Sequence, residues 1–270
     1  HSHNMHNFVV NNPFGNRGQE GATLLYTPNG YETRDSYQKR LAGDMELTQR
    51  AFEKNLGHSA EIYVWPYGEY TKLGAEMAQA AGAKVLFTLG DDVDTKLHRH
   101  LGVNRTIIYN NPGEEEFLKL LNSKKAKVKP LKVGQLDIDL LYDESPEQFE
   151  NNINAAIRLL KRSGANTVFL QSFADENGTG EIESVYFHTT AAPVKKDVFS
   201  HVVQRLQAEQ LLVYAWMPTL ACQWLTRDYP EDLVQATAIS KKGWYNRATP
   251  FSPRVREELK ALFRDLATYS

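Results

Sequence analysis

The feature that most constrains the fold is a regular alternation of short apolar runs and longer amphipathic segments after residue 133. The runs have the length and Val/Leu/Phe content of buried strands, and the intervening segments carry apolar residues at helical spacing. The predicted strands are 133–141, 167–173 and 211–217, and the predicted helices are 146–162, 197–209 and 253–266. Three strand–helix units of this kind predict a parallel sheet, and a (β/α) barrel is the form we expect.

The first 122 residues alternate in the same way, but less regularly. The predicted helices are 36–56, 73–81 and 114–121, and the predicted strands are 60–64, 85–89 and 106–109. Gly57 follows the first helix where a C-terminal cap is expected. Residues 7–33 are rich in Asn, Gly and Pro, which predicts a long surface loop. The class is therefore α/β throughout.

Residues 123–132 separate these two halves. The segment contains five lysines and Pro130 with no aromatic residue, a composition typical of an exposed linker. We therefore expect domains at 1–122 and 133–270. A polyanion-binding patch is the alternative for the lysines, but such a run is usually a solvated segment.

Overall charge argues against nucleic acid as a partner. The net charge of -2 and the pI near 6.5 provide no basic field for nucleic acid or for an anionic membrane surface. The single cysteine, Cys222, is compatible with either redox compartment. No run approaches the roughly 18 apolar residues of a membrane span. The chain opens on His without a signal-like region, so any export signal would have to lie upstream.

Two short stretches in the first half suggest a reactive pocket. Trp65-Pro-Tyr-Gly-Glu-Tyr70 follows a short strand and contains a Pro/Gly turn, where backbone N–H groups are left free for a ligand. His1, His3 and His6 are close enough in sequence to converge on one Zn-like ion. The alternatives are a turn with a packed Trp65, and a purification-tag remnant for the histidines.

Polar and aromatic residues follow each strand of the second half. Chemistry in (β/α) barrels lies at the C-terminal ends of the strands, and carboxylates beside aromatic rings suit sugars. The residues at these ends are Asp137, Asp139, Tyr142, Asp143, Gln171, Phe173, Asp175 and Trp216. For any one of them, capping a helix or packing in the core is an equally good reading. The stretch Asp175-Glu-Asn-Gly-Thr-Gly180 is predicted to be a turn rather than a calcium loop, because Tyr186 occupies the twelfth position where Glu is required.

Taken together, these motifs resemble the two-domain poly-β-1,6-N-acetyl-D-glucosamine N-deacetylases of the PgaB/HmsF type, over essentially the whole chain. The motifs are His1-Ser-His-Asn-Met-His6, Trp65-Pro-Tyr-Gly-Glu-Tyr70, Asp137-Ile-Asp-Leu-Leu-Tyr-Asp143, Phe169-Leu-Gln-Ser-Phe-Ala-Asp175, Tyr214-Ala-Trp-Met-Pro218 and Pro250-Phe-Ser-Pro-Arg-Val-Arg256.

For the first half, the resemblance implies the C-terminal part of a NodB-like deacetylase barrel. His1 and His6 match its two metal-binding histidines, whereas His3 is not a family ligand; the divalent metal would be Zn, Ni, Co or Fe. The backbone N–H of Tyr67 would help to hold the oxyanion, and Trp65 and Tyr67 would contact substrate. For the second half, it implies the N-terminal part of a (β/α)8 glycoside hydrolase barrel. Its sugar groove would be lined by Asp137, Asp139, Gln171, Phe173, Asp175 and Trp216.

The resemblance also implies a setting for the protein. It predicts a β-1,6-linked N-acetylglucosamine polymer as substrate, a periplasmic location at the outer membrane, and an export porin as a possible partner. The family's Thr-Phe-Asp-Asp motif and its hydrolase acid are expected outside these residues, so we expect weak activity or none from this chain alone. A non-catalytic carbohydrate-binding or export scaffold is the alternative function, and an amylase-like glycosidase is a more distant one.

Overall fold

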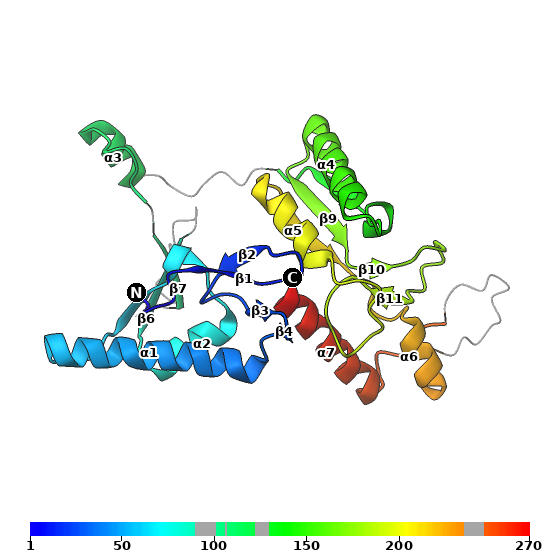
Figure 1. The fold of residues 1–270 in the computed structure, drawn as a ribbon, viewed down its shortest axis with the longest axis horizontal. Helices are drawn as coiled ribbons and strands as arrows, with labels where there is room; N and C mark the ends of the chain where they lie inside the picture. The colour runs from blue at the N-terminus through cyan, green and yellow to red at the C-terminus, as the bar shows by residue number, and fades with distance from the viewer. Residues whose placement is uncertain (90–100, 106, 122–129, 235–245) are drawn as a thin grey trace. The chain divides into compact units, whose positions relative to one another are not determined.

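The computed structural model describes residues 1–89, 101–105, 107–121, 130–234 and 246–270 (Figure 1). The chain divides into two compact units, His1–Lys129 (unit 1) and Pro130–Ser270 (unit 2). The division lies within the segment 123–132 that composition predicted to be a linker. Each unit contains a three-stranded parallel sheet, which confirms the mixed α/β class.

The sheet of unit 1 has the order β5-β6-β7, with β5 at Ile62–Val64, β6 at Val85–Leu89 and β7 at Leu101–Arg105. The predicted strand at 106–109 was wrong. The chain pairs with β6 through Leu101–Arg105 instead, and residues 107–109 are exposed and have no regular structure, while residue 106 lies outside the described residues. Leu101–Arg105 is a strand because it pairs with β6. A local apolar run in the sequence does not show this pairing.

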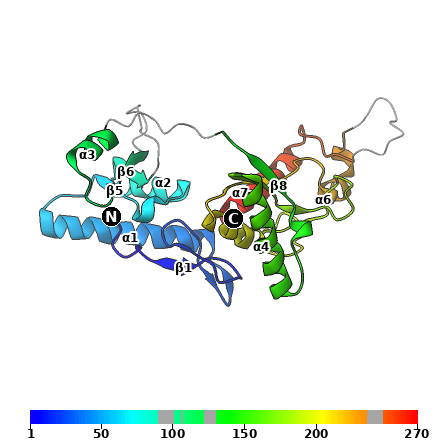
Figure 2. The same cartoon turned by 90° about the horizontal axis from the view of Figure 1, so that it is seen from above.

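The helices of unit 1 lie close to their predicted positions. They are α1 (Arg34–Leu56), α2 (Lys72–Ala80) and α3 (Glu114–Leu121). The hydroxyl of Thr33 caps α1, and Gly57 ends it with a left-handed φ of 75°. Helix α1 is visible along its length in both views (Figures 1 and 2). The core between α1, α2 and the sheet consists of Met45, Tyr63, Trp65, Ala75, Ala78, Ala83 and Leu86.

Residues 7–33 are more structured than the sequence predicted. Two antiparallel pairs form there: β1 (Phe8–Val10) with β2 (Arg17–Gln19), and β3 (Tyr26–Thr27) with β4 (Gly30–Tyr31). The turn between β1 and β2 is organised by the buried Asn12, whose Oδ1 accepts from the backbone N–H groups of Phe14 and Asn16. The Asn- and Gly-rich composition therefore encodes tight turns rather than one long loop.

The sheet of unit 2 has the order β12-β9-β8, with β8 at Val133–Leu136, β9 at Thr167–Gln171 and β12 at Leu212–Trp216. The first two strands are shorter than predicted. After Leu136 the chain turns into the 3-10 helix η2 (Ile138–Leu140), and β9 is followed by β10 (Phe173–Ala174), which pairs with β11 (Ser184–Val185). Consecutive parallel strands are what a barrel segment requires, and the barrel itself stays a prediction.

Four helices accompany this sheet: α4 (Pro146–Ser163), α5 (Phe199–Ala208), α6 (Gln223–Asp228) and α7 (Pro253–Tyr269). Helix α6 was not predicted, because six residues are too few to show a helical period. Residues of α4 and α5 such as Leu160 and Leu206 share one core cluster with Val168 and Leu170 of β9. In the described part of the chain, no helix combines the length and apolar content needed to cross a membrane.

Candidate functional site

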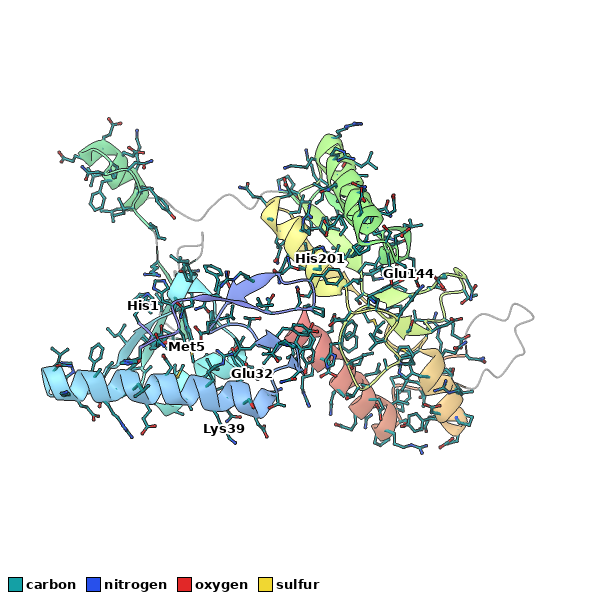
Figure 3. The ribbon with its side chains drawn as sticks, in the orientation of Figure 1. His1, Met5, Glu32, Lys39, Glu144 and His201 are labelled. Atoms are coloured by element: carbon teal, nitrogen blue, oxygen red, sulfur yellow. The ribbon has the colours of Figure 1, made fainter. Side chains whose placement is uncertain are left out.

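The loop of residues 1–6 brings two histidine rings together on unit 1. The ring centroids of His1 and His6 are 4.8 Å apart, and the His6 ring lies 4.5 Å from that of Tyr67. Both histidines are exposed, and Figure 3 labels His1 and Met5 near the two ends of this loop. The two predicted metal ligands and the Trp65–Tyr70 turn are therefore neighbours.

The turn after β5 holds Tyr67 in an uncommon conformation. Tyr67 lies in the 3-10 helix η1 (Pro66–Gly68) with a φ of 55°, and Gly68 follows with a φ of 79°. The N–H groups of Gly68 and Glu69 donate to the carbonyls of Trp65 and Pro66. Within the described residues the Tyr67 N–H has no such acceptor. The turn thus leaves one backbone donor beside His6, as an oxyanion contact requires.

Trp65 packs in the core rather than facing a ligand. Its side chain is 1% exposed, and its ring contacts those of Tyr63 (4.9 Å) and Tyr70 (5.7 Å). Burial favours the packing alternative for Trp65, and its contact with substrate stays a prediction. Tyr67, by contrast, is 43% exposed and contacts the exposed ring of Phe8 at 4.6 Å. The two rings form an apolar wall beside the histidines.

The donor chemistry of this loop suits a divalent metal ion in part. Imidazole nitrogens are common ligands of Zn, Ni, Co and Fe. Among the residues that the structure describes, however, no group of three or more His, Cys, Asp or Glu side chains is arranged to hold a metal. The imidazoles of His1 and His6 are two candidate ligands, and their role in metal binding stays a prediction.

In unit 2, the predicted groove residues meet at the carboxyl end of the sheet around Asp139. One oxygen of Asp139 accepts from the Gln171 side chain (2.7 Å) and the Asp175 backbone N–H (3.0 Å), and the other accepts from the Tyr186 hydroxyl (2.6 Å). Gln171 also donates to the carbonyl of Phe173 (2.8 Å). Asp139 thus has three donors, and Gln171 is buried.

Tyr186 is the member of this cluster that sequence reasoning missed. It is fully buried, and burial together with its hydrogen bond to Asp139 raises the pKa of its hydroxyl above the ordinary value. Tyr186 directly follows β11, and no hydrophobic periodicity in the sequence pointed to it as a site residue. From the sequence it was named only as the twelfth residue of the rejected calcium loop. Tyr186 stays neutral and donates to Asp139 at every physiological pH.

The carboxylate of Asp175 is used by its own turn. It accepts from the backbone N–H groups of Thr179 (2.9 Å) and Gly180 (2.9 Å), which confirms the predicted turn. Asp137 is half-buried and accepts only from Gln135 (3.1 Å) among the described residues. Of the three aspartates, Asp137 is the one whose carboxylate is most available to a ligand.

The two aromatic residues of the predicted groove differ in exposure. Their rings contact each other edge to face at 5.4 Å, but Phe173 is buried whereas Trp216 is 39% exposed. Trp216 pairs directly with Gln171 across the sheet. At this edge the Trp216 ring is exposed and Phe173 and Gln171 are buried. Asp137, Asp139 and Asp175 are all half-buried, and Asp137 accepts the fewest hydrogen bonds.

Comparison with known proteins adds a family. Residues 135–270, just over half of the chain, match the model of a family described as hypothetical glycosyl hydrolase family 13. Poly-beta-1,6-N-acetyl-D-glucosamine N-deacetylases of Escherichia coli strains K12 and O157:H7 are 31% and 30% identical to the chain over 244 residues. The alignment covers 89% of this chain and 36% of each relative, so the chain spans about a third of their length. The resemblance inferred from the motifs is confirmed.

The chain is similar to solved structures of a glycoside hydrolase domain and of a de-N-acetylase. The PgaB (BpsB) glycoside hydrolase domain from Bordetella bronchiseptica is 32% identical, with 51% of this chain and 41% of that chain covered and a TM-score of 0.45. A de-N-acetylase from Aggregatibacter actinomycetemcomitans is 27% identical, with 44% and 45% covered and a TM-score of 0.41. TM-scores in this range do not establish a common fold.

Proposed function

The chain belongs to the hypothetical glycosyl hydrolase family 13, and from this membership and its two units we propose a two-step action on one polymer. Unit 1 takes part in metal-dependent N-deacetylation of poly-β-1,6-N-acetyl-D-glucosamine, and unit 2 binds and cuts the partly deacetylated product. The names of the curated relatives support the substrate. The observation that carries the proposal is the exposed His1–His6 pair beside Tyr67.

In this proposal His1 and His6 hold the ion, and the other residues of the site handle the substrate. A bound divalent ion, Zn, Ni, Co or Fe, would polarise the acetamide carbonyl and lower the pKa of a bound water. The Tyr67 N–H donates to the oxygen that gains negative charge, a contribution of about 3 to 4 kcal/mol for one donor. The rings of Tyr67 and Phe8 offer an apolar surface to the sugar.

Unit 2 provides a sugar-binding edge. The exposed ring of Trp216 can stack on the apolar face of a sugar, and Asp137 can accept from its hydroxyl or amino groups. Removal of acetyl groups leaves amines, which attract a carboxylate. Glycoside cleavage requires two carboxyl groups about 5 to 10 Å apart. Since Asp139 and Asp175 are occupied by structural hydrogen bonds, cleavage needs a carboxyl group beyond these two.

The proposal also includes the setting that the polymer implies. An exported polysaccharide of this kind would be modified on the periplasmic side of the outer membrane and passed to an export porin. A second function, a carbohydrate-binding export scaffold, is favoured by one observation: the described residues offer two metal ligands rather than three. For the same reason we expect weak acetate release or none from these 270 residues.

Mass spectrometry tests the proposed deacetylase activity. It measures the loss of acetyl groups from a β-1,6-linked N-acetylglucosamine oligomer with added Co²⁺ or Zn²⁺. We expect His6→Ala to abolish acetyl loss because it removes one of the two imidazole ligands. A chelator should have the same effect because it removes the ion. His3→Ala is the matched control, since His3 is in the same exposed loop but is not proposed as a ligand.

The outcomes separate the two functions. Acetyl loss that falls with His6→Ala and not with His3→Ala supports the deacetylase. Because these residues alone are expected to show little or no activity, the decisive measurement uses a protein of the relatives' full length. No acetyl loss from that protein under any metal, with oligomer binding retained, contradicts the deacetylase and leaves the scaffold. Equal acetyl loss by wild-type and His6→Ala proteins contradicts the metal role of His6.

A further inference from the structure

Asp44 is a carboxylate on the buried face of α1 for which the proposed chemistry has no use. It lies between Leu41 and Met45 on that face and is 7% exposed. A buried carboxylate is costly unless hydrogen-bond donors compensate it. A residue of this kind on an apolar helix face therefore has partners elsewhere in the fold.

Those partners are backbone groups of the histidine loop. Oδ1 of Asp44 accepts from the N–H of Asn4 at 2.7 Å, and Oδ2 accepts from the N–H of His3 at 3.0 Å. Each carboxylate oxygen thus holds one of two consecutive amides. Hydrogen bonds from backbone N–H groups to a charged acceptor are among the stronger ones in proteins. The contact spans 40 residues of sequence and joins the loop directly to the longest helix of unit 1.

A second contact fixes the other side of the loop. The side-chain amide of Gln19, which is buried, donates to the carbonyl of Met5 at 2.9 Å, and the Met5 side chain is buried as well. The loop itself contains no helix or strand. Ordering such a segment costs about 1 to 2 kcal/mol per residue in backbone entropy, so contacts from outside it must supply its order.

From this geometry we propose that Asp44 is the positioning residue of the histidine loop. By fixing the backbone at His3 and Asn4, it sets the distance between the His1 and His6 rings on either side and so raises the affinity for a divalent ion. This inference rests on the proposed function, because it takes His1 and His6 as ligands. Asp44 itself touches neither ring.

The chemistry of the side chain explains why an aspartate is needed. A carboxylate only accepts, so both of its oxygens can face an N–H group. An asparagine of the same shape has one acceptor and one NH₂ group, so one of the two loop amides would face a donor. Asp44→Asn therefore keeps the volume in the core and removes one of the two hydrogen bonds.

Two measurements on the full chain test the role of Asp44. The first is hydrogen exchange of the His3 and Asn4 amides, followed by NMR. The second is Co²⁺ binding, followed by visible absorption with the metal ion alone. In Asp44→Asn we expect faster exchange at these amides and a Kd for Co²⁺ about 10-fold higher, the lower end of the range for groups that orient metal ligands. Thermal unfolding shows whether the fold is retained.

Asp35→Asn is the matched control, because Asp35 is an exposed aspartate in the first turn of the same helix. We expect it to leave the His3 and Asn4 amides and Co²⁺ binding unchanged. If Asp44→Asn does not fold, the wild-type protein still decides the matter. Its His3 and Asn4 amides must be protected from exchange, and exchange at the rate of a free peptide overturns the proposal.

The results also separate this inference from the function on which it rests. Wild-type Co²⁺ binding that is unchanged in a folded Asp44→Asn protein overturns the positioning role and leaves the deacetylase intact. Absence of Co²⁺ binding in the wild-type protein contradicts the metal site itself, and the positioning role falls with it. Weaker Co²⁺ binding with faster exchange confined to the loop supports both.

Discussion

The two units place polar residues near the ends of similar three-stranded sheets and use them in opposite ways. In unit 2, Asp139 has three donors, and Gln171 and Tyr186, which supply two of them, are buried. In unit 1, the rings of His1 and His6 are exposed, and within the described residues no hydrogen bond to either ring is present. The hydrogen bonds of Asp139 are made within the protein, whereas the rings of His1 and His6 are accessible to a ligand.

This difference separates polar side chains that stabilise the fold from polar side chains that can bind a ligand. A buried polar group whose hydrogen bonds are all made inside the protein stabilises one conformation and has little left for a ligand. An exposed group that has no partner in the protein costs nothing in water and keeps its capacity for a ligand. The sequence predicted both Asp139, in the sugar groove, and His6, as a metal ligand, to be site residues. Only the contacts separate them.

The largest expected effect is that of Asp139→Ala on unit 2. Three donors would lose their acceptor, two of them from buried side chains, which we expect to cost about 4 kcal/mol. Asp137→Ala is the matched control, two residues away, with one hydrogen bond from Gln135, and should cost less than about 1 kcal/mol. Urea unfolding measures both.

The rate of Cys222 alkylation measures the destabilisation of unit 2 by Asp139→Ala separately from unit 1. Its thiol is fully buried, and burial raises its pKa to about 12, so the folded protein should resist alkylation at pH 8. Asp139→Ala should speed the reaction and Asp137→Ala should not. Equal rates in both variants would mean that the hydrogen bonds of Asp139 do not support the fold.

A smaller effect is expected from Gly68→Ala in the turn of unit 1. Gly68 has a left-handed φ of 79°, and an added Cβ would lie 2.5 Å from the backbone nitrogen of Leu89. The conformation and the clash together should cost about 3 kcal/mol. Gly57→Ala has a similar φ of 75° and open space, so it should cost about 1 kcal/mol.

Hydrogen exchange of peptides from unit 1 compares the two glycine variants. The difference between them reports the close approach of β6 to the Tyr67 turn, because both glycines have a left-handed φ. Gly68→Ala should also slow acetyl release, since Tyr67 would move. Equal stability of the two variants would show that the turn tolerates a Cβ next to Leu89.

The smallest expected effect is a dependence of unit 2 on pH through His201. Burial lowers the pKa of His201, although its hydrogen bond to Glu150 opposes this and Arg205 adds to it. The folded pKa is therefore below the unfolded value of about 6.5. Below that pH the unfolded state takes up the proton first, so stability is present above pH 6.5 and is lost as the pH falls through the folded pKa.

Urea unfolding between pH 7.5 and pH 5 measures this loss. His201→Gln keeps a donor for Glu150 and cannot titrate, so we expect a flatter pH profile than that of the wild-type protein. Glu150 also pairs with Arg205, and Arg205→Lys, which keeps the charge, should leave the slope unchanged. A wild-type stability that rises as the pH falls would contradict the direction of this pKa shift.

Much of the architecture was predictable from local pattern. Every predicted helix, α1 to α5 and α7, matches its predicted span within three residues at each end. Capping residues such as Thr33 and Gly57 contribute to this agreement, because they act within one turn. The strand at 106–109 was wrong, because strand pairing depends on a partner distant in sequence. The division of the chain near residue 130 agrees with the lysine-rich segment.

The sequence by itself determined the α/β class, the family resemblance and the groups from which a site is built, since each depends on residue type and spacing. The tertiary structure decided which of these groups stay available. It buried Trp65 and Phe173, closed the carboxylate of Asp139, and left His6 exposed beside Tyr67. The reason is physical: hydrogen bonding and burial depend on neighbours brought together by folding, such as Tyr186 for Asp139, which lies 47 residues away in sequence.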